Sequence, residues 1–107
     1  MGKFLIRQMS NGQYYFNLKA SNGEVLVTSE GYTSKAGCMN GVDAVKINAV
    51  RGNQFIEKTS SNGKYYFNLK SQNGQIIATS QMYSNKNSML GGIEAVRRYA
   101  PNARLDY

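Results

Sequence analysis

The chain contains two copies of one sequence block. Residues 10–19 read Ser-Asn-Gly-Gln-Tyr-Tyr-Phe-Asn-Leu-Lys, and residues 61–70 repeat this block with a single exchange of Gln for Lys. The match continues at a constant offset into the segments that follow each block. A tandem duplication of this kind predicts two similar structural units that bury their apolar faces against each other. We therefore expect one domain over residues 1–107, built from repeats at about 3–52 and 54–107.

Asn-Gly dipeptides divide each repeat into short segments. Four of them occur, at residues 11–12, 22–23, 62–63 and 73–74. Asn-Gly suits a type I′ turn between two antiparallel strands, so each repeat predicts a three-stranded meander. The expected strands span about residues 3–9, 13–20 and 24–29 in the first repeat, and about 54–60, 64–71 and 75–80 in the second.

A helix is expected after each meander, because the apolar spacing changes there from two residues to three or four. The matching apolar positions are Cys38, Val42, Val45 and Ala49 in the first repeat, and Met89, Ile93, Val96 and Ala100 in the second. Polar residues suited to N-caps precede both helices, and Pro101 ends the second. These elements predict an α+β fold in which two helices pack on one face of a single antiparallel sheet, with pseudo-two-fold symmetry.

The composition argues against an enzyme. Histidine is absent, which excludes His-based proton transfer, Ser-His or Cys-His nucleophiles and His-bearing zinc sites. Across the repeats, Glu24 becomes Gln75, and the carboxylate shared by both copies, Asp43 or Glu94, stands beside a basic residue as in an exposed i,i+3 ion pair. Cys38 lies on the apolar stripe and is expected to be buried. We therefore expect no catalytic residue, no cofactor and no metal site.

The chain carries a net charge of +7, from 13 Lys and Arg against six Asp and Glu. Such a charge can attract nucleic acid or an acidic protein or peptide. The basic residues are scattered along the sequence, which more often serves solubility than nucleic-acid binding. On charge alone, nucleic acid is the first candidate ligand and an acidic protein or peptide is the next. A lone cysteine and the lack of a signal peptide or a membrane-length apolar run favour a cytoplasmic location without a membrane partner.

The second strand of each meander carries the first candidate site. Tyr14, Phe16 and Leu18 alternate with a second set that is expected on the face left open by the helices. Aromatic rings, amides and cations on one sheet face can bind single-stranded nucleic acid, because rings stack on bases and cations attract phosphates. The same residues are also ordinary on an exposed strand, and a peptide or partner protein could use them. This candidate binding face consists of Tyr15, Asn17, Lys19, Tyr66, Asn68 and Lys70.

The entries to the two helices form the second candidate site. Hydroxyl groups and unpaired backbone N–H groups at a helix N-terminus can hold an anion. Both copies keep a lysine there, although the helix dipole disfavours a cation at that position. Capping of the helix explains the hydroxyl groups equally well. This candidate anion site consists of Thr33, Ser34, Lys35, Ser84, Asn85 and Lys86.

The repeated string Asn-Gly-x-Tyr-Tyr-Phe-Asn-Leu-Lys, with the later Asn-Gly, Thr-Ser, Tyr-x-x-Lys and Gly-[Val/Ile]-[Asp/Glu]-Ala-Val-[Lys/Arg], resembles the YegP-like family of small bacterial proteins. The resemblance covers nearly the whole chain. It implies β-β-β-α-β units that share a sheet by exchanging their C-terminal strands, with residues 104–107 as a final strand. It implies no activity and no catalytic residues. We therefore expect a monomeric, non-enzymatic binding module. The alternatives are a protein or peptide interaction module and a small-anion-binding enzyme accessory.

The orientation of the first strand stays open at this point. Phe4 and Phe55 match across the repeats and lie on one parity, whereas Ile6 is matched by Glu57 on that same parity. An apolar residue and a carboxylate do not prefer the same side of a half-buried strand, so neither face is assigned.

Overall fold

A computed structural model describes residues 2–106 and confirms the expected order of elements. Each repeat supplies three strands and one helix, and a short 3₁₀ helix and a last strand complete the chain. The elements are β1 (Lys3–Gln8), β2 (Tyr14–Lys19), β3 (Val25–Ser29), α1 (Lys35–Asn48), β4 (Phe55–Thr59), β5 (Tyr65–Lys70), β6 (Ile76–Ser80), α2 (Lys86–Tyr99), η1 (Ala100–Asn102) and β7 (Arg104–Asp106).

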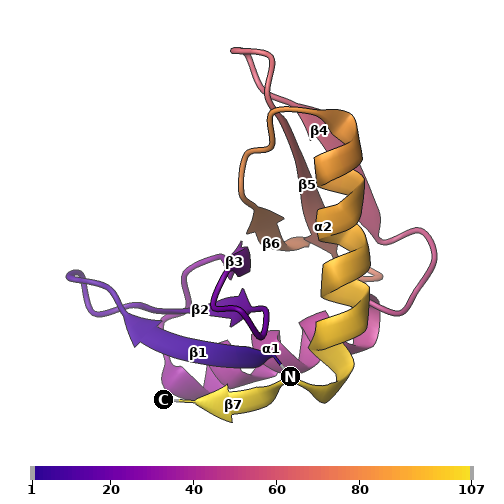
Figure 1. Cartoon of the computed structure of the whole chain (residues 1–107). Coiled ribbons are helices and arrows are strands. Elements are labelled where there is room, and N and C mark those ends of the chain that lie inside the picture. The colour runs from indigo at the N-terminus through magenta and orange to yellow at the C-terminus, as the bar shows by residue number, and fades with distance from the viewer. Residues whose placement is uncertain (1, 107) are drawn as a thin grey trace.

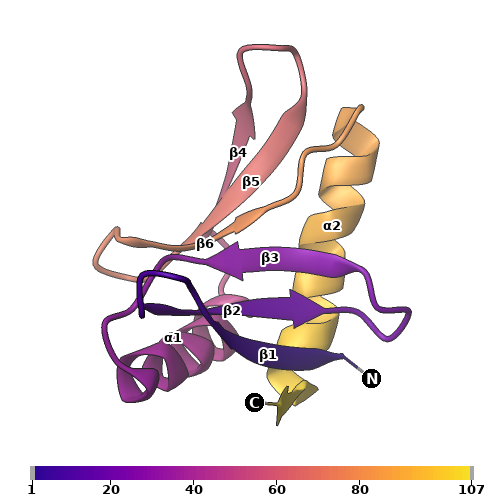
Figure 2. The same cartoon turned by 90° about the vertical axis from the view of Figure 1, so that its left-hand side faces the viewer.

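All strands join in one sheet with the order β4-β5-β6-β3-β2-β1-β7. The two meanders meet in the centre, where β3 and β6 run antiparallel and Thr28 pairs with Thr79. The strands of the second repeat run across the direction of those of the first, so the sheet is strongly twisted (Figure 2). A pseudo-two-fold axis between β3 and β6 therefore relates the repeats.

The last strand makes the sheet mixed rather than wholly antiparallel. β7 leaves the second repeat and pairs with β1 of the first repeat in parallel, with Phe4 opposite Leu105. Figure 1 shows this strand beside β1, close to the N-terminus. The strand exchange expected from the family resemblance therefore occurs in one direction only. Residues 53 and 54 lead directly into β4, so the first repeat has no separate C-terminal strand that could pair with the second repeat.

The turns differ from the type I′ geometry expected for Asn-Gly. Only the glycines have positive φ, for example +88° at Gly12, and no other described residue does. Gly12 N donates to the Met9 carbonyl at 3.0 Å, and Met9 N donates to the Gln13 carbonyl at 2.7 Å. This is a type I turn followed by a glycine bulge. The Asn11 side chain accepts a hydrogen bond from Gln13 N instead of entering the left-handed region.

The core lies between one face of the sheet and the two helices. One cluster of buried apolar side chains joins both repeats, including Phe16 and Phe67, each fully buried. α2 runs behind the strands when the sheet is seen from its other side (Figure 2). Each helix contacts strands of both repeats, since α1 meets β2 and β6 while α2 meets β5 and β3. Because of this crossed packing, neither meander has a complete apolar cover of its own.

The position of β1 and β4 in the sheet resolves the ambiguity of the first strand. β7 pairs with the outer side of β1 over Lys3–Leu5, and Phe4 and Ile6 are both buried in the core. β4 is an edge strand along its whole length, and there Phe55 is half-buried and Glu57 is exposed. A charge directed to the core side of an edge strand is a common device against strand pairing between molecules. Ile6 and Glu57 thus share a face and differ in burial.

Candidate functional site

The residues of the predicted binding face lie on the side of the sheet opposite the helices, and its two asparagines form hydrogen bonds within the sheet. Asn17 is 8% exposed and Asn68 is 6% exposed. Each amide nitrogen donates a 2.9 Å hydrogen bond to a threonine hydroxyl on the neighbouring strand, Thr28 or Thr79. A buried amide in such a pair contributes to strand register.

The rings and lysines of this face remain accessible in part. Tyr15, Lys19, Tyr66 and Lys70 are all half-buried. Register places a further cation opposite each ring, because Arg7 pairs with Tyr15 and Lys58 pairs with Tyr66. The candidate binding face expected from the sequence includes these tyrosines and lysines, but it does not include Arg7 and Lys58.

Strand alternation gathers basic residues on this open face. Lys3 and Arg104 complete the set at the β1–β7 edge, where they pair in register. Of the two carboxylates on the described strands, Asp106 lies on the open face, at 3.7 Å from Lys3, and Glu57 lies on the helix side. The basic residues of the open face are Lys3, Arg7, Lys19, Lys58, Lys70 and Arg104. The fold thus concentrates charges that are scattered in the sequence.

The helix entries use their polar side chains as caps. Ser34 Oγ accepts a hydrogen bond from Gly37 N at 3.0 Å, and Asn85 Oδ1 accepts one from Ser88 N at 2.8 Å. Thr33 and Ser84, the alternative caps, are exposed. Lys86 lies 3.8 Å from Glu57 of β4, so its position at the helix start has a partner within the fold. The geometry therefore accounts for the second candidate site largely as helix capping.

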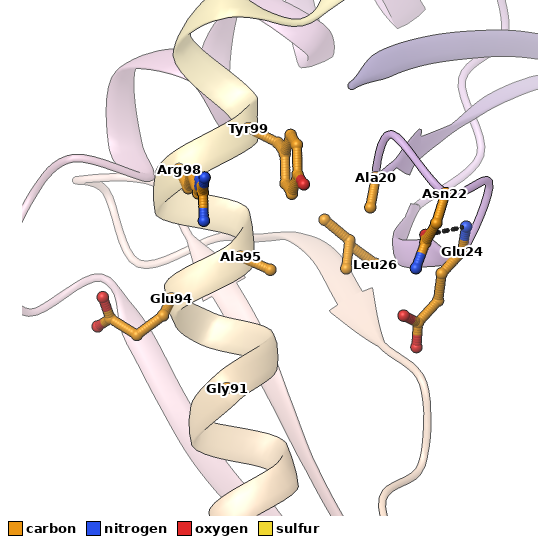
Figure 3. A pocket seen from close by; sticks show the side chains of 9 residues that line it. All are labelled: Ala20, Asn22, Glu24, Leu26, Gly91, Glu94, Ala95, Arg98 and Tyr99. Carbon is orange, nitrogen blue, oxygen red and sulfur yellow. Dashed lines mark hydrogen bonds between the residues drawn. The ribbon is translucent and has the colours of Figure 1, made fainter. Parts of the chain in front are cut away.

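A groove that the sequence did not reveal lies between α2 and the β2–β3 hairpin (Figure 3). Its main part has a volume of about 450 Å³. Leu26 lies between the two walls, Glu24 stands on the hairpin side, and Arg98 and Tyr99 stand on the helix side. At one end of the groove, the hydroxyl group of Tyr99 forms a 3.1 Å hydrogen bond with Ser21 Oγ and so joins the helix to the hairpin. Glu94 points away from the hairpin in Figure 3 and pairs with Arg97 at 2.8 Å.

Three titratable groups have raised pKa values because of burial. Burial raises the pKa of the Cys38 thiol, and Cys38 is fully enclosed in the core. Burial, with smaller contributions from Cys38 and Glu30, raises the pKa of Tyr32. Burial, with a smaller contribution from Glu24, raises the pKa of Tyr83. All three groups therefore stay neutral near pH 7, and none is activated as a nucleophile.

The described part of the chain offers neither a metal site nor a membrane span made of helix. Residues 2–106 hold no group of three or more Cys, Asp or Glu side chains arranged to bind a metal ion. Within the same range, neither helix is long and apolar enough to cross a membrane.

Comparison with known families places the fold. The domain of unknown function DUF1508 matches twice, at residues 10–53 and 60–106. The chain belongs to this family. Each match covers one repeat, so this member of the DUF1508 family is a tandem pair, as the duplicated sequence block indicates.

Curated relatives resemble the chain over most of their length. A UPF0339 protein encoded beside the ptx operon of Stutzerimonas stutzeri is 43% identical over 104 residues, which are 97% of this chain and 94% of that protein. The UPF0339 protein YegP of Escherichia coli K12 is 46% identical over 96 residues, which are 90% of this chain and 87% of that protein.

Two solved structures confirm the arrangement of elements. The solution structure of YegP from Escherichia coli, described as a protein of unknown function, has a TM-score of 0.93 and 42% identity, and covers 98% of this chain and 90% of its own. That of a UPF0339 protein from Shewanella oneidensis has a TM-score of 0.92 at the same identity, covering 98% and 89%. Membership of the DUF1508 family therefore supports the fold and does not identify a ligand.

The duplication itself carried a signal for the groove. Four residues of the groove stand at positions where the repeats differ. The groove at α2 has Glu24, Gly91, Arg98 and Tyr99, and the matching positions of the other repeat are Gln75, Asn40, Ile47 and Asn48. These residues are specific to one repeat, whereas the tyrosines and lysines of the open face occur in both.

Proposed function

We propose that this protein is a non-enzymatic binding module that takes single-stranded nucleic acid on the open face of its sheet. The observation that carries the proposal is that six basic side chains share that face with two half-buried tyrosines, of which Tyr15 is opposite Arg7 and Tyr66 is opposite Lys58. Cations attract the phosphates, and tyrosine rings stack on bases without sequence preference.

The geometry suits short segments of a strand. β2 and β5 are separated by β3 and β6, so their mean separation is about 14 Å at a strand spacing of about 4.8 Å. Tyr15 with Arg7 and Tyr66 with Lys58 form two similar sites related by the pseudo-two-fold axis. The axis reverses direction, so the two sites would contact separate segments of nucleic acid in opposite polarity. Stacking and charge attraction tolerate this reversal, because neither depends on strand direction.

The test is the salt dependence of binding to a fluorescein-labelled oligothymidylate, followed by fluorescence anisotropy. Affinity should fall steeply with salt concentration, and Lys19→Ala with Lys70→Ala should reduce the log–log slope by about 1.4, at about 0.7 for each phosphate that is no longer neutralised. Arg51→Ala with Arg98→Ala removes the same charge from exposed positions outside the strands and is the matched control.

Two outcomes would overturn the proposal. One is the absence of binding at low salt. The other is an equal loss of slope in the control variant, since that would mean that net charge alone, and not the open face, attracts the oligonucleotide.

A further inference from the structure

The groove between α2 and the β2–β3 hairpin extends beyond its main part. A second hollow of about 350 Å³ shares Glu24 and Leu26 with the first and continues along α2 to Tyr83 and Ser88. From Ser88 to Arg98 the helix rises by about 15 Å, at about 1.5 Å for each residue. The combined groove is therefore elongated, with the nearly buried Leu26 at its floor. Its size is within the range of small-molecule sites.

The two walls of this groove carry opposite charges. Glu24 stands on the hairpin wall and borders both hollows, whereas Arg98 stands on the helix wall and borders the hollow nearer Tyr99. The ion pairs found among residues 2–106 involve neither Glu24 nor Arg98. The negative charge of Glu24 nevertheless has an electrostatic effect within the groove, because it contributes to the raised pKa of Tyr83 at the far end.

The second repeat offers an uncharged version of the same groove. The hollow between α1 and the β5–β6 hairpin has a volume of about 360 Å³ and is bordered by Ile47, Asn48 and Asn73. Ile47 takes the place of Arg98, and Gln75 takes the place of Glu24. Asn40 takes the place of Gly91, whose missing side chain leaves open space in the charged groove. The pair of opposite charges is thus specific to one of the two grooves.

We propose that the groove at α2 binds a short zwitterionic peptide, with its ammonium group at Glu24 and its carboxylate at Arg98. The two charges stand on opposite walls of one hollow, so one ligand that reaches both needs an ammonium group at one end and a carboxylate at the other. A hollow of about 450 Å³ has room for a peptide of a few small residues. The floor of Leu26, Gly91 and Ala95 accepts small apolar side chains. A guanidinium group binds a carboxylate through two parallel hydrogen bonds, which a lysine cannot offer.

The test uses trialanine and two blocked forms, N-acetyl-trialanine and trialanine amide, titrated into the ¹⁵N-labelled protein. Trialanine should shift the backbone amide signals of residues 20–26 and 88–99 and leave the signals of 71–77 in place. Each blocked peptide lacks one charge and should bind about tenfold more weakly, as expected when one charge-assisted hydrogen bond is removed.

Two variants that copy the second repeat identify the partner of each charge. Glu24→Gln should bind trialanine about tenfold more weakly and should no longer distinguish the acetylated form, because the carboxylate that pairs with the ammonium group is already absent. Arg98→Ile should likewise become insensitive to amidation. Both residues are exposed, so both variants should keep the native spectrum. Gln75→Ala, at the position of the second repeat that matches Glu24, is the matched control and should bind as the unaltered protein does.

The proposal is overturned if millimolar trialanine leaves residues 20–26 and 88–99 unshifted, or if the blocked peptides bind as well as trialanine. It is also overturned if Glu24→Gln keeps its preference for the unblocked amino terminus. Oligonucleotide binding on the open face is separate from this site, so Glu24→Gln should leave it unreduced, and failure of one proposal does not decide the other.

Discussion

A Cβ atom on Gly92 would clash with the ring of Tyr83, because its hydroxyl oxygen would lie closer than a van der Waals contact and its Cζ atom would lie at 2.8 Å. The ring cannot easily leave, because the backbone of Tyr83 is paired with Tyr65 by two hydrogen bonds of 2.9 and 2.7 Å. The first repeat has the same relationship between Tyr32 and Gly41. The glycine in each helix thus permits a tyrosine to pack between helix and sheet.

Neighbouring glycines in α2 should therefore respond in opposite directions. Gly92→Ala should lower the free energy of unfolding by about 1–3 kcal/mol, because the ring must move to admit the methyl group. Gly91→Ala should raise it by about 0.5–1 kcal/mol, because its Cβ meets nothing within 4 Å and alanine favours the helix. Urea unfolding of both variants provides the measurement. Equal effects of the two substitutions would contradict this packing.

Ser80 should matter for stability and not for ligand binding. Its hydroxyl group accepts a hydrogen bond from the buried N–H of Phe67 at 2.9 Å and donates one to the Gln81 carbonyl at 2.8 Å. Ser80→Ala leaves the N–H of Phe67 without this acceptor and should lower the free energy of unfolding by about 1–3 kcal/mol. Urea unfolding measures the loss. The exposed Ser84→Ala should change stability by less than about 0.5 kcal/mol, and a similar loss in both variants would argue against this role.

Glu57 should protect the edge of the sheet. Glu57→Ile gives the second repeat the same residue that the first repeat has at the matching position, Ile6. Because β4 is an edge strand, this apolar residue should promote pairing of β4 between molecules. We expect concentration-dependent self-association in sedimentation velocity, with little change in the unfolding transition at low concentration. Glu57→Gln, which removes the charge without adding an apolar surface, is the control. An Ile variant that stays as dispersed as this control would show that Glu57 has no protective effect.

Alkaline pH should destabilise the fold through its buried phenols and its thiol. The folded state raises the pKa of Tyr83 above its ordinary value of 10.0, so the neutral form is preferred on folding. The stabilisation is fully present below that ordinary value and is lost as pH rises through the folded pKa. Tyr83→Phe cannot ionise and should show a shallower loss of stability above pH 10 in urea unfolding. A loss as steep as in the unaltered protein would contradict the assignment.

The sequence predicted those elements whose signals are local. Apolar periodicity places both helices, and Ser34 and Asn85 were among the cap residues that it indicated. Asn-Gly marked every hairpin but not its geometry, because a glycine bulge meets the demand for positive φ with one residue and leaves asparagine in an ordinary conformation. The turn type therefore depends on the flanking strand register, which the dipeptide does not encode.

The features that the sequence did not predict depend on contacts between segments far apart in the chain. Whether the start of β1 or β4 forms an edge depends on where β7 docks, nearly a full chain length away. The difference in burial between Ile6 and Glu57 likewise depends on tertiary packing that their own segments do not encode. Asn17 looked like a ligand-binding residue because alternation places it on the open face, but its hydroxyl partner lies on another strand. The groove at α2 joins two repeats, and no motif within one of them describes it.

The docking of β7 on β1 also has a consequence for cooperativity. β7 follows the helix of the second repeat in the chain, but it pairs with the first strand of the first repeat. The pairing of Phe4 with Leu105 therefore closes a loop of about a hundred residues, and the entropic cost of closing it falls only when most of the sheet has formed. The first repeat does not complete its sheet without the second, so the two should fold and unfold as one unit rather than repeat by repeat.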